Sequence, residues 1–69
     1  GGELQTIRFE YTGPSLESVL DRLPTAKVLR VTEKGWIVEA EVFGTGIDMW
    51  VRSQGDYIKD YKTIRSDRI

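Results

Sequence analysis

The sequence contains no cysteine and no histidine, and these two absences exclude several kinds of site. Without cysteine there is no disulfide framework, and zinc sites built on cysteine or histidine cannot form. Without histidine there is no catalytic triad of the serine–histidine–aspartate kind. The chain also lacks an apolar run of membrane-spanning length and a signal-peptide pattern. We therefore expect a cytoplasmic protein with no metal site, no cofactor and no membrane segment.

Charge of one sign is lacking as well. The 10 basic and 11 acidic residues are intermixed along the chain and leave a net charge of -1. A nucleic-acid-binding domain usually carries a basic patch and a high isoelectric point. The balance of charges therefore argues against direct DNA binding by this domain.

The length limits what the chain can build. A single domain of 69 residues buries only about 60% of its unfolded surface, so it is marginal alone and gains from a partner. We expect a module of a larger protein at least as readily as an independent one. We assign residues 1–3 to a linker or cloning remnant because of Gly1-Gly2, residues 4–61 to one domain, and residues 62–69 to a C-terminal tail.

The stretch Val28–Phe43, VLRVTEKGWIVEAEVF, is typical of a β-hairpin. Two runs rich in valine, isoleucine and tryptophan flank Lys34-Gly35, and glycine readily adopts the positive φ that a tight two-residue turn requires. Such a turn places Glu33 opposite Trp36, and this register sorts the side chains onto two faces. The face assigned to the core carries Leu29, Val31, Val38, Ala40 and Val42. The other face carries Val28, Arg30, Ile37, Glu39, Glu41 and Phe43.

Strand and helix patterns flank the hairpin. Leu4–Tyr11 alternates with period two and predicts a strand. Ser15–Leu23 places its apolar residues on one helical stripe. A second helix is predicted from about Gly46 to Gln54, with Gly55 in a left-handed conformation at its end, followed by a strand over Asp56–Tyr61.

The resulting order β-α-β-β-α-β predicts an α+β, ferredoxin-like fold. Right-handed crossovers place both helices on one face of a four-stranded antiparallel sheet. The predicted core comprises Ile7, Phe9, Leu16, Val19, Leu20, Leu23, Leu29, Val31, Val38, Ala40, Val42, Ile47, Trp50, Val51 and Ile58. The opposite sheet face stays uncovered within this chain.

This uncovered face is the predicted working surface. It mixes apolar side chains with charges of both signs, which suits contact with another protein domain better than open water. In the predicted register Arg30 faces Glu39 as a cross-strand ion pair. The candidate interface residues are Arg8, Glu10, Val28, Arg30, Ile37, Glu39, Glu41 and Phe43.

Three other functions fit the residues less well. A phosphatase of the acylphosphatase kind needs a glycine- and arginine-rich anion cradle, which the loop Tyr11–Ser15 lacks. Glu39 and Glu41 stand roughly 6.6–7 Å apart along one strand, but on an open face and not in the cleft that acid–base chemistry uses. An RNA-binding module of the RRM type needs basic and aromatic residues where this chain has those glutamates. We expect no catalytic residues.

The order and spacing of five segments resemble a known family. These are the strand Ile7-Arg8-Phe9, the helix ending Val19-Leu20-Asp21-Arg22-Leu23-Pro24, the turn Glu33-Lys34-Gly35-Trp36, the helix over Ile47–Gly55 with Trp50, and a strand around Tyr57-Ile58-Lys59. Together they cover about Leu4–Ile64 and resemble the C-terminal extension, or WCX domain, that follows WYL domains in bacterial transcriptional regulators.

The resemblance implies a non-catalytic accessory domain that mediates dimerisation or relays a ligand signal between domains. Its implied partners are the preceding WYL and winged-helix domains of the same protein and a second copy of the full-length regulator. An ACT-like module that binds a small molecule is the alternative, because it shares the topology. Its ligand is expected at the loop Gly44-Thr45-Gly46 or at the turn Thr12–Ser15.

Overall fold

The computed structural model describes residues 4–67, which form four strands, two helices and a short 3-10 turn. The elements are β1 (Leu4–Tyr11), α1 (Leu16–Arg22), β2 (Lys27–Val31), β3 (Trp36–Phe43), α2 (Gly44–Gln54), η1 (Gly55–Tyr57) and β4 (Ile58–Asp67). The strands lie in the order β2-β3-β1-β4, and each neighbouring pair is antiparallel. The predicted linker or cloning remnant at residues 1–3 lies outside the described residues, as do residues 68 and 69.

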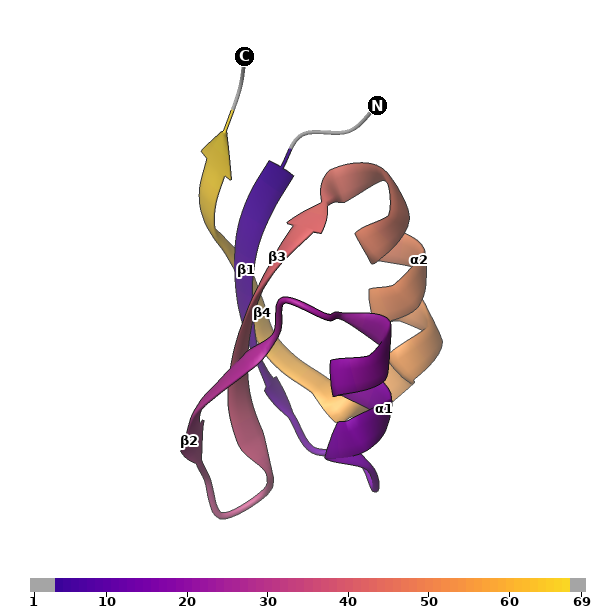
Figure 1. Ribbon diagram of the computed structural model, residues 1–69. Helices are drawn as coiled ribbons and strands as arrows, with labels where there is room; N and C mark the ends of the chain where they lie inside the picture. Colours follow the sequence, from indigo (N-terminus) through magenta and orange to yellow (C-terminus); the bar gives the residue numbers. More distant parts are fainter. Residues whose placement is uncertain (1–3, 68–69) are drawn as a thin grey trace.

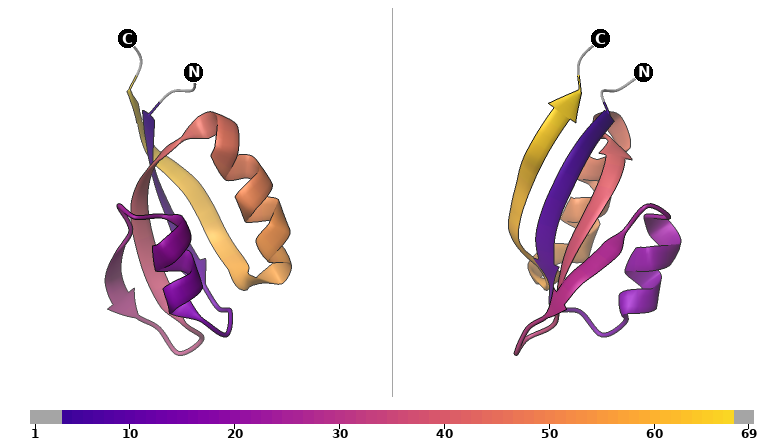
Figure 2. Two further views of the ribbon diagram at one scale, coloured as in Figure 1. Left: turned by 45° about the vertical axis from the view of Figure 1, so that its right-hand side comes forward. Right: turned by 60° about the vertical axis from the view of Figure 1, so that its left-hand side comes forward.

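The molecule has two layers, with both helices on one face of the sheet (Figure 1). The right-hand view of Figure 2 looks onto the other face, where the strands are in front and α2 lies behind them. We call this uncovered side the open face. The arrangement confirms the α+β ferredoxin-like fold predicted from the order of the elements.

The helices begin and end close to the predicted residues. α1 ends where the N–H of Leu23 donates to the carbonyl of Val19 at 2.9 Å, directly before Pro24. α2 begins at Gly44, so it starts two residues earlier than predicted. Gly55 ends the helix with a φ of 59°, as the predicted left-handed conformation requires, but its ψ of -128° lies outside the left-handed helical region. Within residues 4–67 no helix has the length and apolar character needed to cross a membrane.

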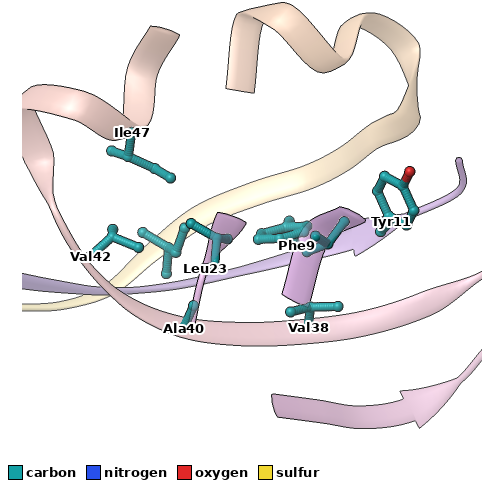
Figure 3. Close-up of a cluster of buried hydrophobic side chains, with 9 residues drawn as sticks. Phe9, Tyr11, Leu23, Val38, Ala40, Val42 and Ile47 are labelled. Carbon is teal, nitrogen blue, oxygen red and sulfur yellow. The ribbon is translucent and has the colours of Figure 1, made fainter. Parts of the chain in front are cut away.

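The core fills the space between the helices and the sheet. Its buried residues are Ile7, Phe9, Tyr11, Val19, Leu23, Val38, Ala40, Val42 and Ile47. In Figure 3 the side chains of β1 and β3 point towards Leu23 and Ile47 on the helical side. Phe9 lies at the centre, with its ring centroid 5.8 Å from that of Trp50 and 6.5 Å from that of Tyr61. The alternation read from β1 and from the second half of the hairpin is therefore confirmed.

The turn between β2 and β3 spans four residues, which is longer than predicted. It is closed by the N–H of Thr32, which donates to the carbonyl of Gly35 at 2.7 Å. Gly35 does not have the positive φ expected of it. Among the described glycines, only Gly55 has a positive φ. Space requires the glycine instead. A Cβ atom at Gly35 would overlap the carbonyl oxygen of Tyr11 and lie 2.9 Å from its carbonyl carbon.

The longer turn and a β-bulge change the register of β2. Val31 lies opposite Trp36 and Val28 lies opposite Val38, with the bulge inserting Leu29. Residues directly opposite each other share a sheet face. Val28 therefore lies on the helix-covered side beside the buried Val38, and its assignment to the open face was wrong.

β2 contributes less to the core than predicted, because all five of its residues are exposed. Leu29 is 46% exposed and Val31 is 73% exposed, so the prediction that they are core residues was wrong. Leu20 of α1, also predicted to be buried, is 36% exposed. The physical reason is that β2 is an edge strand and α1 has only seven residues, about 10 Å of helix.

The last strand is longer than predicted. β4 runs over Ile58–Asp67, so residues 62–67 belong to the sheet and not to a tail. Its pairing with β1 shifts register twice, and Asp60 has a φ of 54° at one of these irregularities. Leu4 lies opposite Asp67, which places the start of β1 beside the end of β4 at one end of the sheet (Figure 1).

Candidate interaction surface

Rows of side chains cross the strands of the open face. One row consists of Lys27, Glu39, Arg8 and Lys62. The next consists of Arg30, Ile37, Glu10 and Lys59. A third consists of Glu41, Thr6 and Arg65. The glutamates thus stand on the central strands, while the outer strands β2 and β4 carry cations.

Seven of the eight predicted interface residues are brought onto this face, since only Val28 is displaced. Glu41 and Phe43 stand toward the end where Leu4 and Asp67 meet, away from the ion pair at the centre. Both are exposed, and Phe43 is 63% exposed. Single exposed apolar side chains are common on protein surfaces, and Val31 and Met49, which lie outside the open face, are 73% and 77% exposed.

An ion pair joins the two central strands. The Nη2 of Arg8 donates to Oε2 of Glu39 at 2.9 Å, and its Nε donates to the same oxygen at 3.3 Å. The two side chains are 38% and 23% exposed, so the pair contributes no more than about 1 kcal/mol. The prediction that Arg30 faces Glu39 was wrong: Lys27 takes that position, and Arg30 lies opposite Ile37.

A second polar contact holds the β2–β3 turn against β1. The hydroxyl of Thr32 donates to the carboxylate of Glu10 at 2.6 Å and accepts the N–H of Gly35 at 2.9 Å. Hydrogen bonds to a charged group are stronger than those between neutral groups. Glu10 therefore acts as an anchor for the turn, a role that the pattern of residues does not predict.

A groove of about 630 Å³ hollows the open face between the outer strands. Its lining includes Arg8, Glu10 and Ile37 from the central strands, Leu29 and Arg30 from β2, and Asp60 and Lys62 from β4. Both sides of the groove are irregular, since β2 is bulged at Leu29 and β4 shifts register near Asp60. Leu29, Asp60 and Lys62 are not among the predicted interface residues, because period-two alternation cannot locate a bulge.

One signal for Lys62 is present in the sequence. Lys59, Lys62 and Arg65 recur every three residues, yet their partners on β1 are Glu10, Arg8 and Thr6, which recur every two. Each register shift inserts one extra residue into β4, so the three cations share one face. A three-residue repeat of basic side chains in a strand is the pattern that indicates this arrangement.

Tyr61 of β4 lines the groove and also packs against the core. Its ring stacks on Phe9 at an interplanar angle of 21°. Burial, and then the nearby carboxylate of Asp48, raise the pKa of the Tyr61 hydroxyl above its ordinary value of 10.0. Tyr61 thereby connects the open-face strand to the helical layer.

The two loops considered for a small ligand are both built into the fold. The segment Gly44–Gly46 is the first turn of α2. At the other, the N–H of Thr12 donates to the carbonyl of Tyr57 at 2.8 Å. A hollow of about 310 Å³ adjoins Gly46 and is lined in part by Arg22. Among residues 4–67 no group of three or more acidic, histidine or cysteine side chains is placed to hold a metal ion.

Comparisons of this chain with protein-family models, with curated proteins and with solved structures found no match. A ferredoxin-like fold serves many unrelated functions. The function must therefore be argued from the chemistry of the open face.

Proposed function

We propose that the chain is a non-catalytic interaction domain that acts through its open face. Following the family resemblance, we assign it the role of the extension after a WYL domain in a bacterial transcriptional regulator, in dimerisation or in relaying a ligand signal between domains. The single observation that carries this proposal is the composition of the open face: one complete side of the sheet lacks a helix within residues 4–67 and combines apolar residues with a groove.

The physical chemistry of that face supports a protein partner. Leu29 and Phe43 are 46% and 63% exposed, and Ile37 lies on the same face between Arg30 and Glu10. Covering apolar surface stabilises a complex by about 25 cal/mol per Å² of area removed from water. Because so small a domain has a limited core, such a contact adds proportionately more to its stability.

The charges on the face distinguish this partner from DNA or RNA. Glu41 is exposed on a central strand and forms no ion pair within residues 4–67, so its carboxylate repels phosphate. A protein surface can instead pair with both the acids and the flanking cations. We assign the partners as the preceding WYL and winged-helix domains and a second copy of the regulator, with no direct DNA contact by this domain.

An ACT-like module is the second candidate, and the hollow beside Gly46 is the observation that favours it. Its volume is about 310 Å³, against about 630 Å³ for the open-face groove. The alternative predicts that a free amino acid or nucleotide raises the melting temperature of the chain. It also predicts that changing Arg22 to Gln removes that increase.

Replacing Ile37 with Lys tests the interaction proposal in the full-length protein that contains this chain. Ile37 is part of the open face and lines the groove, so a lysine there should weaken assembly or the response to the regulator's ligand. Met49→Lys is the matched control, because Met49 is 77% exposed on the helical layer. Circular dichroism must show both variants folded. Unchanged assembly and unchanged DNA response in Ile37→Lys would contradict the proposal.

A further inference from the structure

The open-face groove has a chemistry that identifies the kind of partner segment it accepts. We infer that it binds an amphipathic helix whose apolar stripe is flanked on both sides by acidic residues. This inference rests on the proposed function and deepens it, since it names the element that docks on the open face. Three arguments support it: the unpaired cations on opposite sides of the groove, the engaged acid on its floor, and the number of strand spacings between its sides.

The cations stand on the two outer strands. Arg30 of β2 and Lys62 of β4 line opposite sides of the groove, and within residues 4–67 neither forms an ion pair or a side-chain hydrogen bond. Lys59 continues the basic column on β4. Unpaired cations on both sides attract a segment that carries carboxylates along both flanks.

The acidic side chain on the floor of the groove is already hydrogen-bonded, so it does not neutralise these cations. Glu10 is the acid on the floor, and its carboxylate accepts a hydrogen bond from Thr32. Arg8 beside it is paired with Glu39, which lies outside the lining of the groove. Between these pairs, Ile37 provides an apolar centre, and the bulge at Leu29 adds a second apolar side chain at the margin. The partner must therefore be apolar along its middle and acidic at its edges.

The geometry favours a helix over an extended strand. Three strand spacings separate β2 from β4, which is about 14 Å, and a helix with its side chains is about 10–12 Å across. An extended segment pairs its backbone with the edge of a sheet, whereas a segment on a sheet face must satisfy its own backbone hydrogen bonds. A helix satisfies them internally, so it is the element that fits between the two cationic sides.

One side chain opposes this partner and supplies the sharpest control. Asp60 lies on the β4 side of the groove beside Lys62 and carries the same charge as the expected ligand. Its φ of 54° is tolerated by asparagine as well as by aspartate. Asp60→Asn should therefore strengthen binding while leaving the strand intact. Loss of Arg30 or Lys62 should have the opposite effect and weaken binding.

The probe is a displayed library of helical peptides of about 15 residues, presented to the 69-residue chain at low ionic strength. The apolar stripe is fixed, and each flanking position is Glu, Gln or Lys. We expect selection of Glu at both flanks. Titration of the selected peptide should then show about threefold weaker binding for Arg30→Gln and for Lys62→Gln, and about tenfold for the double variant.

Lys34→Gln is the matched control, because it removes the same charge from an exposed residue of the β2–β3 turn outside the groove. It should leave the affinity unchanged, and Asp60→Asn should raise it about threefold. In NMR spectra of the chain, the backbone amide signals that shift when the peptide binds should belong to the strands that line the groove.

Four results would overturn the inference: no enrichment from the library, selection of Gln or Lys, equal weakening by Lys34→Gln and Lys62→Gln, or displacement of the peptide by a single-stranded RNA. Self-association that is lost in Lys62→Gln would identify a second copy as the occupant and would also overturn it. None of these results bears on whether Ile37→Lys disrupts full-length assembly, so the proposed function is judged separately.

Discussion

Replacing Gly35 with alanine should be the most damaging single-methyl change in the protein. The added Cβ would overlap the carbonyl oxygen of Tyr11, and it would lie 2.9 Å from that residue's carbonyl carbon and 3.1 Å from the Cα of Thr12. All three atoms belong to the backbone, so no side-chain rotation relieves the overlap. The end of β1 or the β2–β3 turn has to move, which also strains the hydrogen bond between Thr32 and Glu10.

The size of the effect follows from the protein's size. Overpacking a well-packed site costs about 1–3 kcal/mol, and an overlap that only a shift of the backbone can relieve belongs at the upper end, about 3 kcal/mol. A domain of 69 residues has a total stability of about 3–10 kcal/mol. Gly35→Ala should therefore remove about a third or more of the free energy of unfolding, and it should lower the urea midpoint by about 1–3 M.

Gly46 provides a control of opposite sign. A Cβ at this position in α2 meets no atom within 4 Å, and alanine is favoured over glycine in a helix by about 1 kcal/mol. Urea unfolding followed by circular dichroism should show Gly46→Ala more stable than the parent and Gly35→Ala much less stable. If Gly35→Ala unfolds within about 0.5 M of the parent, the close approach of the turn to Tyr11 is not a constraint on the fold.

Three further predictions concern polar groups. Because the pKa of Tyr61 is raised in the folded state, the contribution of its neutral hydroxyl to folding stability is fully present below pH 10.0 and is lost as the pH rises through the folded-state pKa. Tyr61→Phe should flatten this loss of stability in thermal melts above that pH. An equal loss in both proteins would contradict the prediction. A double-mutant cycle between Arg8 and Glu39 should give a coupling of about 0.5 kcal/mol that shrinks in high salt, whereas a salt-independent coupling would mean that the pair is not screened by solvent. The hydroxyl of Thr25 donates to the carbonyl of Glu41 at 2.7 Å and accepts its N–H at 2.9 Å, so Thr25→Val should lower the free energy of unfolding by about 1–2 kcal/mol, with Thr25→Ser as the control that retains it.

Strands with regular alternation were predictable from the sequence. β1 was placed residue for residue, since Ile7, Phe9 and Tyr11 repeat without interruption and all are buried. The order of the elements then followed from two helical stripes, and it determined the fold. These features depend on local periodicity, which a single sequence displays directly.

Irregular pairing was not predictable in the same way. The bulge at Leu29 and the four-residue turn shifted β2, so Val28 and Leu29 exchanged the faces assigned to them. The predicted last strand ended too early, at Tyr61. The register shifts of β4 break the period-two pattern, and its edge position leaves it polar. Bulges depend on how a strand meets its neighbour, and the neighbour is specified elsewhere in the chain.

The candidate surface was therefore predicted in composition but not in shape. Its charged and apolar residues on β1 and β3 were identified, whereas Lys27, Leu29 and the β4 residues were not. The ion pair was assigned to Arg30 instead of Arg8. The groove arises from the two irregular edge strands, so it has no counterpart in a reading based on regular alternation.

The pairing of Leu4 with Asp67 has a mechanical consequence. Because β1 and β4 are antiparallel and these residues meet at one end, a force that pulls the two strand ends apart acts first on the hydrogen bonds nearest that end. The hydrogen bonds then break one after another and do not share the force. Peeling proceeds from Leu4 towards the row that joins Arg8 to Lys62, so a modest pull would open the β4 side of the groove while α1 and β3 still hold the core together.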